Sequence, residues 1–166
     1  MKMKKIKFLS ILLAFPLIFS GQIDSITIKK TLEEVNVNAI KADKNTPIAF
    51  TNLTQKEIQK SNLGQDLPFI ISLTPSIVTS SDAGAGIGYT GFRIRGTDPS
   101  RINVTINGIP LNDSESQGVW WVNMPDFASS LENIQIQRGV GTSTNGAAAF
   151  GASINLQTIG LNTKAY

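Results

Sequence analysis

Hydrophobic and polar positions alternate with a period of two over several short stretches of the chain, and this pattern predicts β-strands. The clearest strand is Ile102-x-Val104-x-Ile106, which Asn107-Gly108 follows as a strong turn signal. Residues 131–137 show the same alternation. Shorter strands are expected at 48–53, at 77–78, at Phe92-x-Ile94 and at 154–156.

Two short helices interrupt the strand pattern. Thr54-x-x-Glu57 forms a capping box, which predicts a helix that continues to about Ser61. A second helical segment of one or two turns is expected within residues 65–73. No internal repeat and no linker divides residues 47–158. We therefore expect the fold class α+β, with a small mixed β-sheet, short helices and long glycine-rich loops.

Small residues fill the segment that follows the 131–137 strand. Glycines stand at positions 139, 141, 146 and 151, and such residues let one backbone pack closely against another. A phosphate-binding P-loop would need a lysine after its second glycine, where this chain has Ala147. The glycines of residues 84–88 do not fit the dinucleotide-binding pattern either, because no acidic residue follows at the expected distance. Both glycine stretches are interpreted as turns and packing segments.

The first 21 residues differ from the rest of the chain. Four lysines lie within the first seven residues, and a mainly apolar stretch from Phe8 to Phe19 follows. This pattern is typical of a secretory signal peptide, and the stretch is too short for a membrane-spanning helix. A buried core helix is the alternative, although four flanking lysines would be unusual there. We expect cleavage near residues 20–22.

Removal of such a leader changes the charge balance. It leaves 11 basic and 12 acidic residues, a net charge of −1 in place of +3, so no basic face for nucleic acid is expected. The chain contains no cysteine and no histidine. Zinc sites of the Cys/His type and nucleophile pairs with histidine are thereby excluded within it. We expect no metal site, no cofactor and no nucleic-acid partner.

Four segments together carry a family resemblance. They are LEEVNVNA (32–39), GFRIRG (91–96), INVTINGIP (102–110) and ENIQIQRGVGTSTNGAAAFGAS (132–153). In this order and spacing they resemble the N-terminal plug domain of TonB-dependent outer-membrane receptors, over about residues 32–158. The resemblance implies an outer-membrane location, a surrounding β-barrel of 22 strands and the periplasmic domain of TonB as partners.

The resemblance also suggests a division of the chain. We expect a flexible segment at 22–46, the plug domain at 47–160 and a tail at 161–166 where a barrel would begin. A 22-stranded wall needs about 220 residues, so the barrel is expected to be missing from this chain. A truncated precursor, a broken reading frame and a free-standing plug stay open as explanations.

The flexible segment contains a sequence similar to a TonB box. Its valines alternate with asparagines, and an extended segment of this kind can add a strand to the sheet edge of a periplasmic partner. An ordinary edge strand of the domain is the alternative. The residues assigned to the box are Leu32, Glu33, Glu34, Val35, Asn36, Val37, Asn38 and Ala39.

Three arginines are candidates for contact with a barrel. Arg93 and Arg95 are expected on one face of one strand. Arg138 ends another strand, and a glycine follows it directly at a corner, as a glycine follows Arg95. In the family, arginines at matching corners lock onto glutamates of the barrel wall, and Arg95 and Arg138 match those corners best. An internal pair with Glu132 and simple solvation are the alternatives.

Ligand contact is expected in three apical loops of the resembled family, residues 84–90, 97–101 and 113–122. Aromatic side chains with scattered polar groups suit a bulky organic ligand such as a metal chelate. Core or interface packing is the alternative for the two tryptophans. The candidate residues are Tyr89, Asp98, Arg101, Gln117, Trp120 and Trp121, in loops that also contain Asp113 and Glu115.

The expected function is therefore that of a gating and ligand-sensing plug, without enzymatic activity and unable to transport without its barrel. A ferric siderophore or ferric citrate is the expected ligand, and glycan import is the second possibility. A soluble exported binding module stays open as an alternative from another class. A hydrolase that uses Asp113 with Glu115 or Asp126 is the least favoured, because neighbouring loop carboxylates are usually solvated.

Overall fold

The structure is a computed structural model that describes residues 41–140 and 149–160. These residues belong to one compact unit. The expected signal peptide, the TonB-box-like residues 32–39 and the tail 161–166 lie outside the described residues. In the part that is described, no helix has the length and apolar character needed to cross a membrane.

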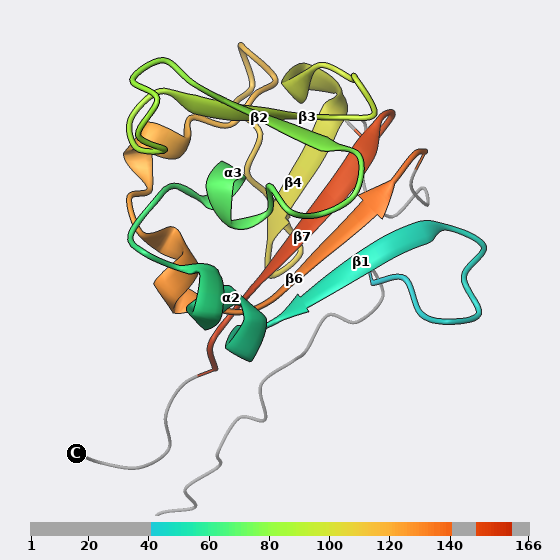
Figure 1. The fold of residues 1–166 in the computed structure, drawn as a ribbon. Coiled ribbons are helices and arrows are strands. Elements are labelled where there is room, and N and C mark those ends of the chain that lie inside the picture. Colours follow the sequence, from blue (N-terminus) through green and yellow to red (C-terminus); the bar gives the residue numbers. More distant parts are fainter. Residues whose placement is uncertain (1–40, 141–148, 161–166) are drawn as a thin grey trace, which may run out of the picture. The chain divides into compact units, whose positions relative to one another are not determined.

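A five-stranded mixed sheet forms the centre of the fold (Figure 1). Its strand order is β1-β6-β7-β4-β5. All neighbours are antiparallel except β4 and β7, which run parallel with Ile102 opposite Ala152. The strands are β1 (Ala49–Thr54), β4 (Ile102–Ile106), β5 (Ile109–Pro110), β6 (Leu131–Arg138) and β7 (Ala152–Thr158).

The two faces of this sheet differ in chemistry, because successive side chains of a strand point to opposite sides. One face carries the apolar core residues of β4, β6 and β7, such as Val104, Ile136 and Ile154. The other face is buried as well, yet polar. We call it the polar face, and its buried members are Asn103, Thr105, Gln135, Gln137, Ser153 and Asn155.

Shorter elements cover the apolar face. The hairpin of β2 (Ile77–Ser81) and β3 (Thr90–Ile94) and the helix α3 (Leu67–Ile70) lie in front of the larger sheet in Figure 1. Phe92, Ile94 and Ile71 belong to the same core cluster as the apolar face. The remaining elements are α2 (Gln55–Ser61) and the 3₁₀ turns η3 (Pro99–Arg101), η4 (Trp121–Asn123) and η5 (Phe127–Ser130).

The expected fold class is confirmed, and so is the helix that begins after Thr54. The backbone N–H of Thr54 donates to the Glu57 carboxylate at 2.8 Å, which is the capping-box contact that the spacing predicts. The second helix is shorter than expected and covers only Leu67–Ile70. It begins after Asp66, with Pro68 in its first turn, where a missing backbone donor is tolerated.

Candidate functional site

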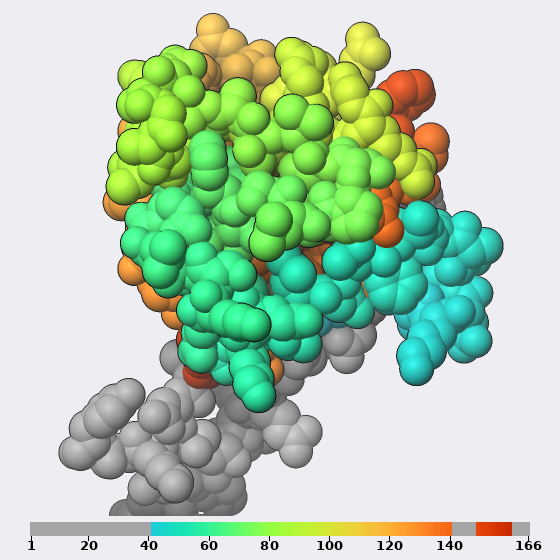
Figure 2. All heavy atoms as spheres, viewed as in Figure 1, coloured from blue at the N-terminus to red at the C-terminus, as the bar shows by residue number. Residues whose placement is uncertain are grey.

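A cavity of about 370 Å³ lies between the β2–β3 hairpin, η3 and the loop before η4. In Figure 2 the light-green and yellow segments, which include β2, β3 and the turn that follows, lie side by side at the top of the view. All three loops expected to contact a ligand contribute to its wall. Of the residues predicted to contact a ligand, four line the cavity: Tyr89, Asp98, Trp120 and Trp121.

The two tryptophans of the cavity have different roles. Trp120 is 53% exposed, whereas Trp121 is 3% exposed and packs on Phe92 with ring centroids 5.8 Å apart. The Trp121 side chain therefore serves mainly in core packing, which is the alternative to ligand contact. Trp120, together with the exposed ring of Tyr89, leaves aromatic surface open at the cavity for a flat or bulky organic molecule.

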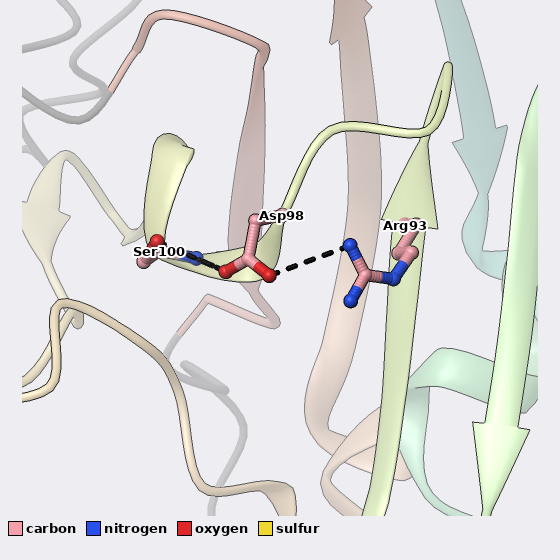
Figure 3. Close-up of polar contacts among 3 residues, drawn as sticks. All are labelled: Arg93, Asp98 and Ser100. Carbon is pink, nitrogen blue, oxygen red and sulfur yellow. Dashed lines mark hydrogen bonds and ion pairs between the residues drawn. The ribbon is translucent and has the colours of Figure 1, made fainter.

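Local hydrogen bonds orient the Asp98 carboxylate at the cavity wall (Figure 3). Asp98 precedes η3, and its Oδ1 accepts from the Ser100 backbone N–H at 3.1 Å and from the Ser100 hydroxyl at 2.9 Å. Its Oδ2 lies 3.4 Å from Arg93 Nη1. These two hydrogen bonds, with smaller help from the positive charges of Arg93 and Arg101, lower the pKa of Asp98. The carboxylate is therefore ionised and oriented.

Two of the predicted ligand residues do not line this cavity. Arg101 ends η3, and its carbonyl accepts from Gly151 N. Gln117 stands in the left-handed backbone region with φ of 58°, and its Nε2 donates to the Ser114 carbonyl. Both residues stabilise their loops, and the structure does not bring their side chains to the cavity wall.

The sequence did not indicate the strand residues that line the cavity. Ser80, Thr90 and Phe92 line it because β2 pairs with β3 in a register that places Ser80 opposite Gly91. Asp66 supports this wall, since it is 1% exposed and its Oδ2 accepts from the Thr90 hydroxyl at 2.8 Å. Nothing in the residue types indicates these contacts, because they depend on the pairing of the two strands.

The loop carboxylates do not form an acid–base pair. Asp113 Oδ2 accepts from the backbone N–H and the hydroxyl of Ser116, and these bonds lower the pKa of Asp113. Asp126 accepts from Asn62 and Ser129, which lowers its pKa as well. A general acid needs a raised pKa, so the arrangement gives no support to hydrolysis.

Two of the three arginines meet at one corner, which we call the arginine corner: Arg95, Arg138 and Gly139. The Nη1 of Arg95 lies 3.3 Å from the place where a Cβ of Gly139 would be, and Gly139 has φ of 107°. Arg138 Nη1 donates to the Pro75 carbonyl at 3.2 Å. The positive φ of Gly139 and the nearby Arg95 guanidinium group both favour glycine at 139, because a side chain there would be strained and would crowd that group.

The expectation that Arg93 and Arg95 share a strand face is wrong. Arg95 follows the end of β3 with φ of 52°, so the alternation of the strand does not extend to it. Arg93 instead forms an ion pair with Asp98, the only ion pair within the described residues. Glu132 is not near Arg138, because they are six positions apart along β6, which places them about 20 Å apart.

Comparison with known proteins identifies relatives of this chain. Residues 42–153 match the family model described as the TonB-dependent Receptor Plug Domain. The chain is 28% identical over 110 residues to the vitamin B12 transporter BtuB of Vibrio vulnificus, covering 66% of this chain and 17% of that protein. It is 28% identical over 142 residues to the hemoglobin and hemoglobin-haptoglobin-binding protein A of Haemophilus influenzae, covering 76% and 13%.

Solved structures show the same fold. The siderophore receptor PirA of Acinetobacter baumannii matches with a TM-score of 0.54 and 19% identity, over 68% of this chain and 17% of that one. The pyoverdine-bound FpvA of P. aeruginosa matches with a TM-score of 0.55 and 22% identity, over 70% and 14%. The matched part of this chain therefore spans between about one eighth and one sixth of the length of these relatives.

Proposed function

Given that this chain belongs to the plug-domain family of TonB-dependent receptors, we propose that it closes the channel of an outer-membrane transporter and senses a metal chelate on the outer side. The family is one of outer-membrane receptors and transporters and not of enzymes. In this proposal residues 1–21 direct export, residues 22–46 connect the plug to the energised partner, and residues 47–160 form the plug.

The cavity is the observation that carries the ligand proposal. Its exposed aromatic surface at Tyr89 and Trp120 can pack against an organic chelator, and the hydroxyl groups of Ser80 and Ser100 can bind polar edges. Proteins with the same fold include receptors for siderophores. An iron chelate such as a ferric siderophore or ferric citrate is therefore our first choice of ligand.

The arginine corner supports a second part of the proposal. Arg95 and Arg138 have no carboxylate partner among the described residues, although guanidinium groups favour carboxylates in bidentate geometry. We assign their partners to glutamates on the wall of the surrounding barrel. Arg93, the third candidate, is engaged by Asp98 and contributes less to this contact.

The mechanism that follows is gating through the N-terminal segment. Ligand in the cavity changes the exposure or order of residues 32–39, and the periplasmic domain of TonB then binds them by strand addition. Traction on that segment shifts the plug and opens a path. The supporting feature is the alternation of valine and asparagine in this segment.

The ligand proposal is tested by NMR on the indole N–H signals of the two tryptophans in the 166-residue chain. Ferric catecholate or ferric citrate in the cavity should broaden the Trp120 signal at low ligand ratios, because paramagnetic iron broadens nearby protons. The gallium complexes, which are diamagnetic, should shift the same signal without broadening it. Substitution of Trp120→Ala should weaken binding, measured by calorimetry.

The exposed residue Leu73, which is outside the cavity wall, provides the matched control. Leu73→Ala should bind the gallium complex like the unchanged chain. Equal effects of Trp120→Ala and Leu73→Ala would contradict a site at the cavity. A response to maltooligosaccharides and none to either chelate would replace iron-chelate sensing with glycan sensing.

A further inference from the structure

The chain contacts the polar face of the sheet at Ala42, before it enters β1. The backbone N–H of Ala42 donates to Gln135 Oε1 at 2.7 Å, and the Ala42 carbonyl accepts from Gln135 Nε2 at 2.9 Å. Ala42 is 7% exposed, and the adjacent Lys41 ammonium donates to Gln157 of β7. One glutamine amide thus binds both backbone groups of a single residue, as a neighbouring strand would.

The Gln135 amide has no remaining hydrogen-bonding capacity. Besides its two bonds with Ala42, its Nε2 donates to Asn52 Oδ1 at 2.8 Å and its Oε1 accepts from Gln137 Nε2 at 2.8 Å. An amide offers two donor hydrogens and two acceptor lone pairs, and all four are used. Gln135 is 1% exposed, so departure of Ala42 leaves a buried donor and a buried acceptor that only water can satisfy.

The contact at Ala42 stands apart from the hydrogen bonds of the sheet. A turn separates it from β1. In this turn, Asp43 N donates to Thr46 Oγ1 and Thr46 N donates to the Asp43 carbonyl, each at 3.0 Å. Strand β1 is then held along its full length by pairing with β6, from Ala49 to Thr54. Tension that arrives from the residues before Lys41 therefore reaches Ala42 before it reaches β1.

We propose that the Gln135 amide is a latch, which holds the chain's own N-terminal segment on the polar face at Lys41–Ala42 and opens before β1 leaves β6. Opening admits water to the polar face while the five-stranded sheet stays paired. The source of the tension, the energised periplasmic partner, rests on the proposed function. The latch itself depends only on the described residues.

Hydrogen exchange measured by NMR on the 166-residue chain tests this proposal. In the unchanged chain, the Ala42 amide should exchange through an opening that leaves the β1 amides protected. In Gln135→Leu, the Ala42 backbone amide should exchange on the order of tenfold faster, because both hydrogen bonds between Ala42 and the Gln135 side chain are lost. The Thr46 amide, held by the turn alone, should exchange at an unchanged rate.

Asn133→Leu is the matched control, because the Asn133 side chain lies on the same strand and donates to Leu53 O instead of Ala42. It should leave Ala42 exchange unchanged. Equal Ala42 exchange in Gln135→Leu and the unchanged chain, with β6 still protected, would overturn the latch. Exchange of Ala42 only together with β1 would overturn the order of opening.

A second variant covers the case in which Gln135→Leu does not fold. Ala42→Pro removes the N–H that donates to Gln135 Oε1 and leaves the residues of β1 and β6 unchanged. With one of its two hydrogen bonds lost, the contact should open more often, so the Gln135 Nε2 proton that donates to the Ala42 carbonyl should exchange faster than in the unchanged chain. Unchanged exchange of that proton would contradict the latch. Neither experiment contains ligand or partner protein, so failure of the proposed function and failure of the latch are distinguishable.

Discussion

Gly151 occupies a place where the chain has no room for a side chain. A Cβ at this position would lie 2.2 Å from Thr97 Cγ2 and 2.7 Å from Thr97 Cβ. Rotation about the Cα–Cβ bond of Thr97 can move the methyl group and leaves its Cβ in place. The contact joins the segment after β3 to the start of β7, where Gly151 N also donates to the Arg101 carbonyl.

Substitution of Gly151→Ala should therefore lower the free energy of unfolding by about 1–3 kcal/mol, as overpacking of a filled site does. Urea unfolding of the 166-residue chain measures this change. Gly118→Ala is the control, because its Cβ would meet nothing closer than 3.7 Å. In a double-mutant cycle, Thr97→Gly should reduce the cost of Gly151→Ala; equal costs with and without Thr97 would contradict the close contact.

At the scale of elements, the arginine corner brings together the ends of β3 and β6, which lie in different sheets. Arg95 follows the first and Arg138 ends the second. We predict that the double substitution Arg95→Gln with Arg138→Gln changes the free energy of unfolding by less than about 1 kcal/mol. The reason is that neither arginine forms an ion pair among the described residues, and Arg95 is exposed while Arg138 is only half-buried, so that their charges contribute little.

Ile136→Ala provides the reference for that measurement. Ile136 is fully buried in the same strand as Arg138, so its truncation should cost about 2–5 kcal/mol. A loss of similar size in the double arginine variant would show that the corner stabilises the plug from within. The arginines would then not be reserved for an outside partner.

Alternation and capping residues predicted most of the elements, because those signals are local. Ile102-x-Val104-x-Ile106 became β4, and Thr54 with Glu57 became the start of α2. Arg95 shows the limit of the same reasoning, since the period of a strand ends where the backbone enters the left-handed region. The glycine after Arg95 marks a corner in the sequence, but not that Arg95 itself takes the positive φ, because its N–H donates to the carbonyl of Ser76, a residue distant in the chain.

The candidate site was less predictable than the fold. Tyr89 and Trp120 were found because they are aromatic residues in the apical loops that the family resemblance indicates, and both line the cavity. The buried Asp66 that supports Thr90, and the Gln135 amide that binds Ala42, were not found. Each contact joins residues far apart in the sequence, and the types Asp and Gln are common on solvated surfaces.

On the scale of the whole molecule, the proposed plug has two regions with different tasks. The cavity lies between the β2–β3 hairpin, η3 and the loop before η4, whereas Lys41 and Ala42 contact the polar face. The five-stranded sheet connects the two, because Val104 of β4 lines the cavity and Gln135 of β6 binds Ala42. A plug that senses ligand on one side and is pulled from the other needs this separation.

The most direct test of that account is binding between the 166-residue chain and the periplasmic domain of TonB, measured by calorimetry. We predict binding that Val37→Pro abolishes, because proline removes a backbone donor from the added strand, and that Leu73→Ala leaves unchanged. Absence of binding at millimolar concentrations, or equal binding by Val37→Pro, would contradict the claim that residues 32–39 connect this plug to its energy source.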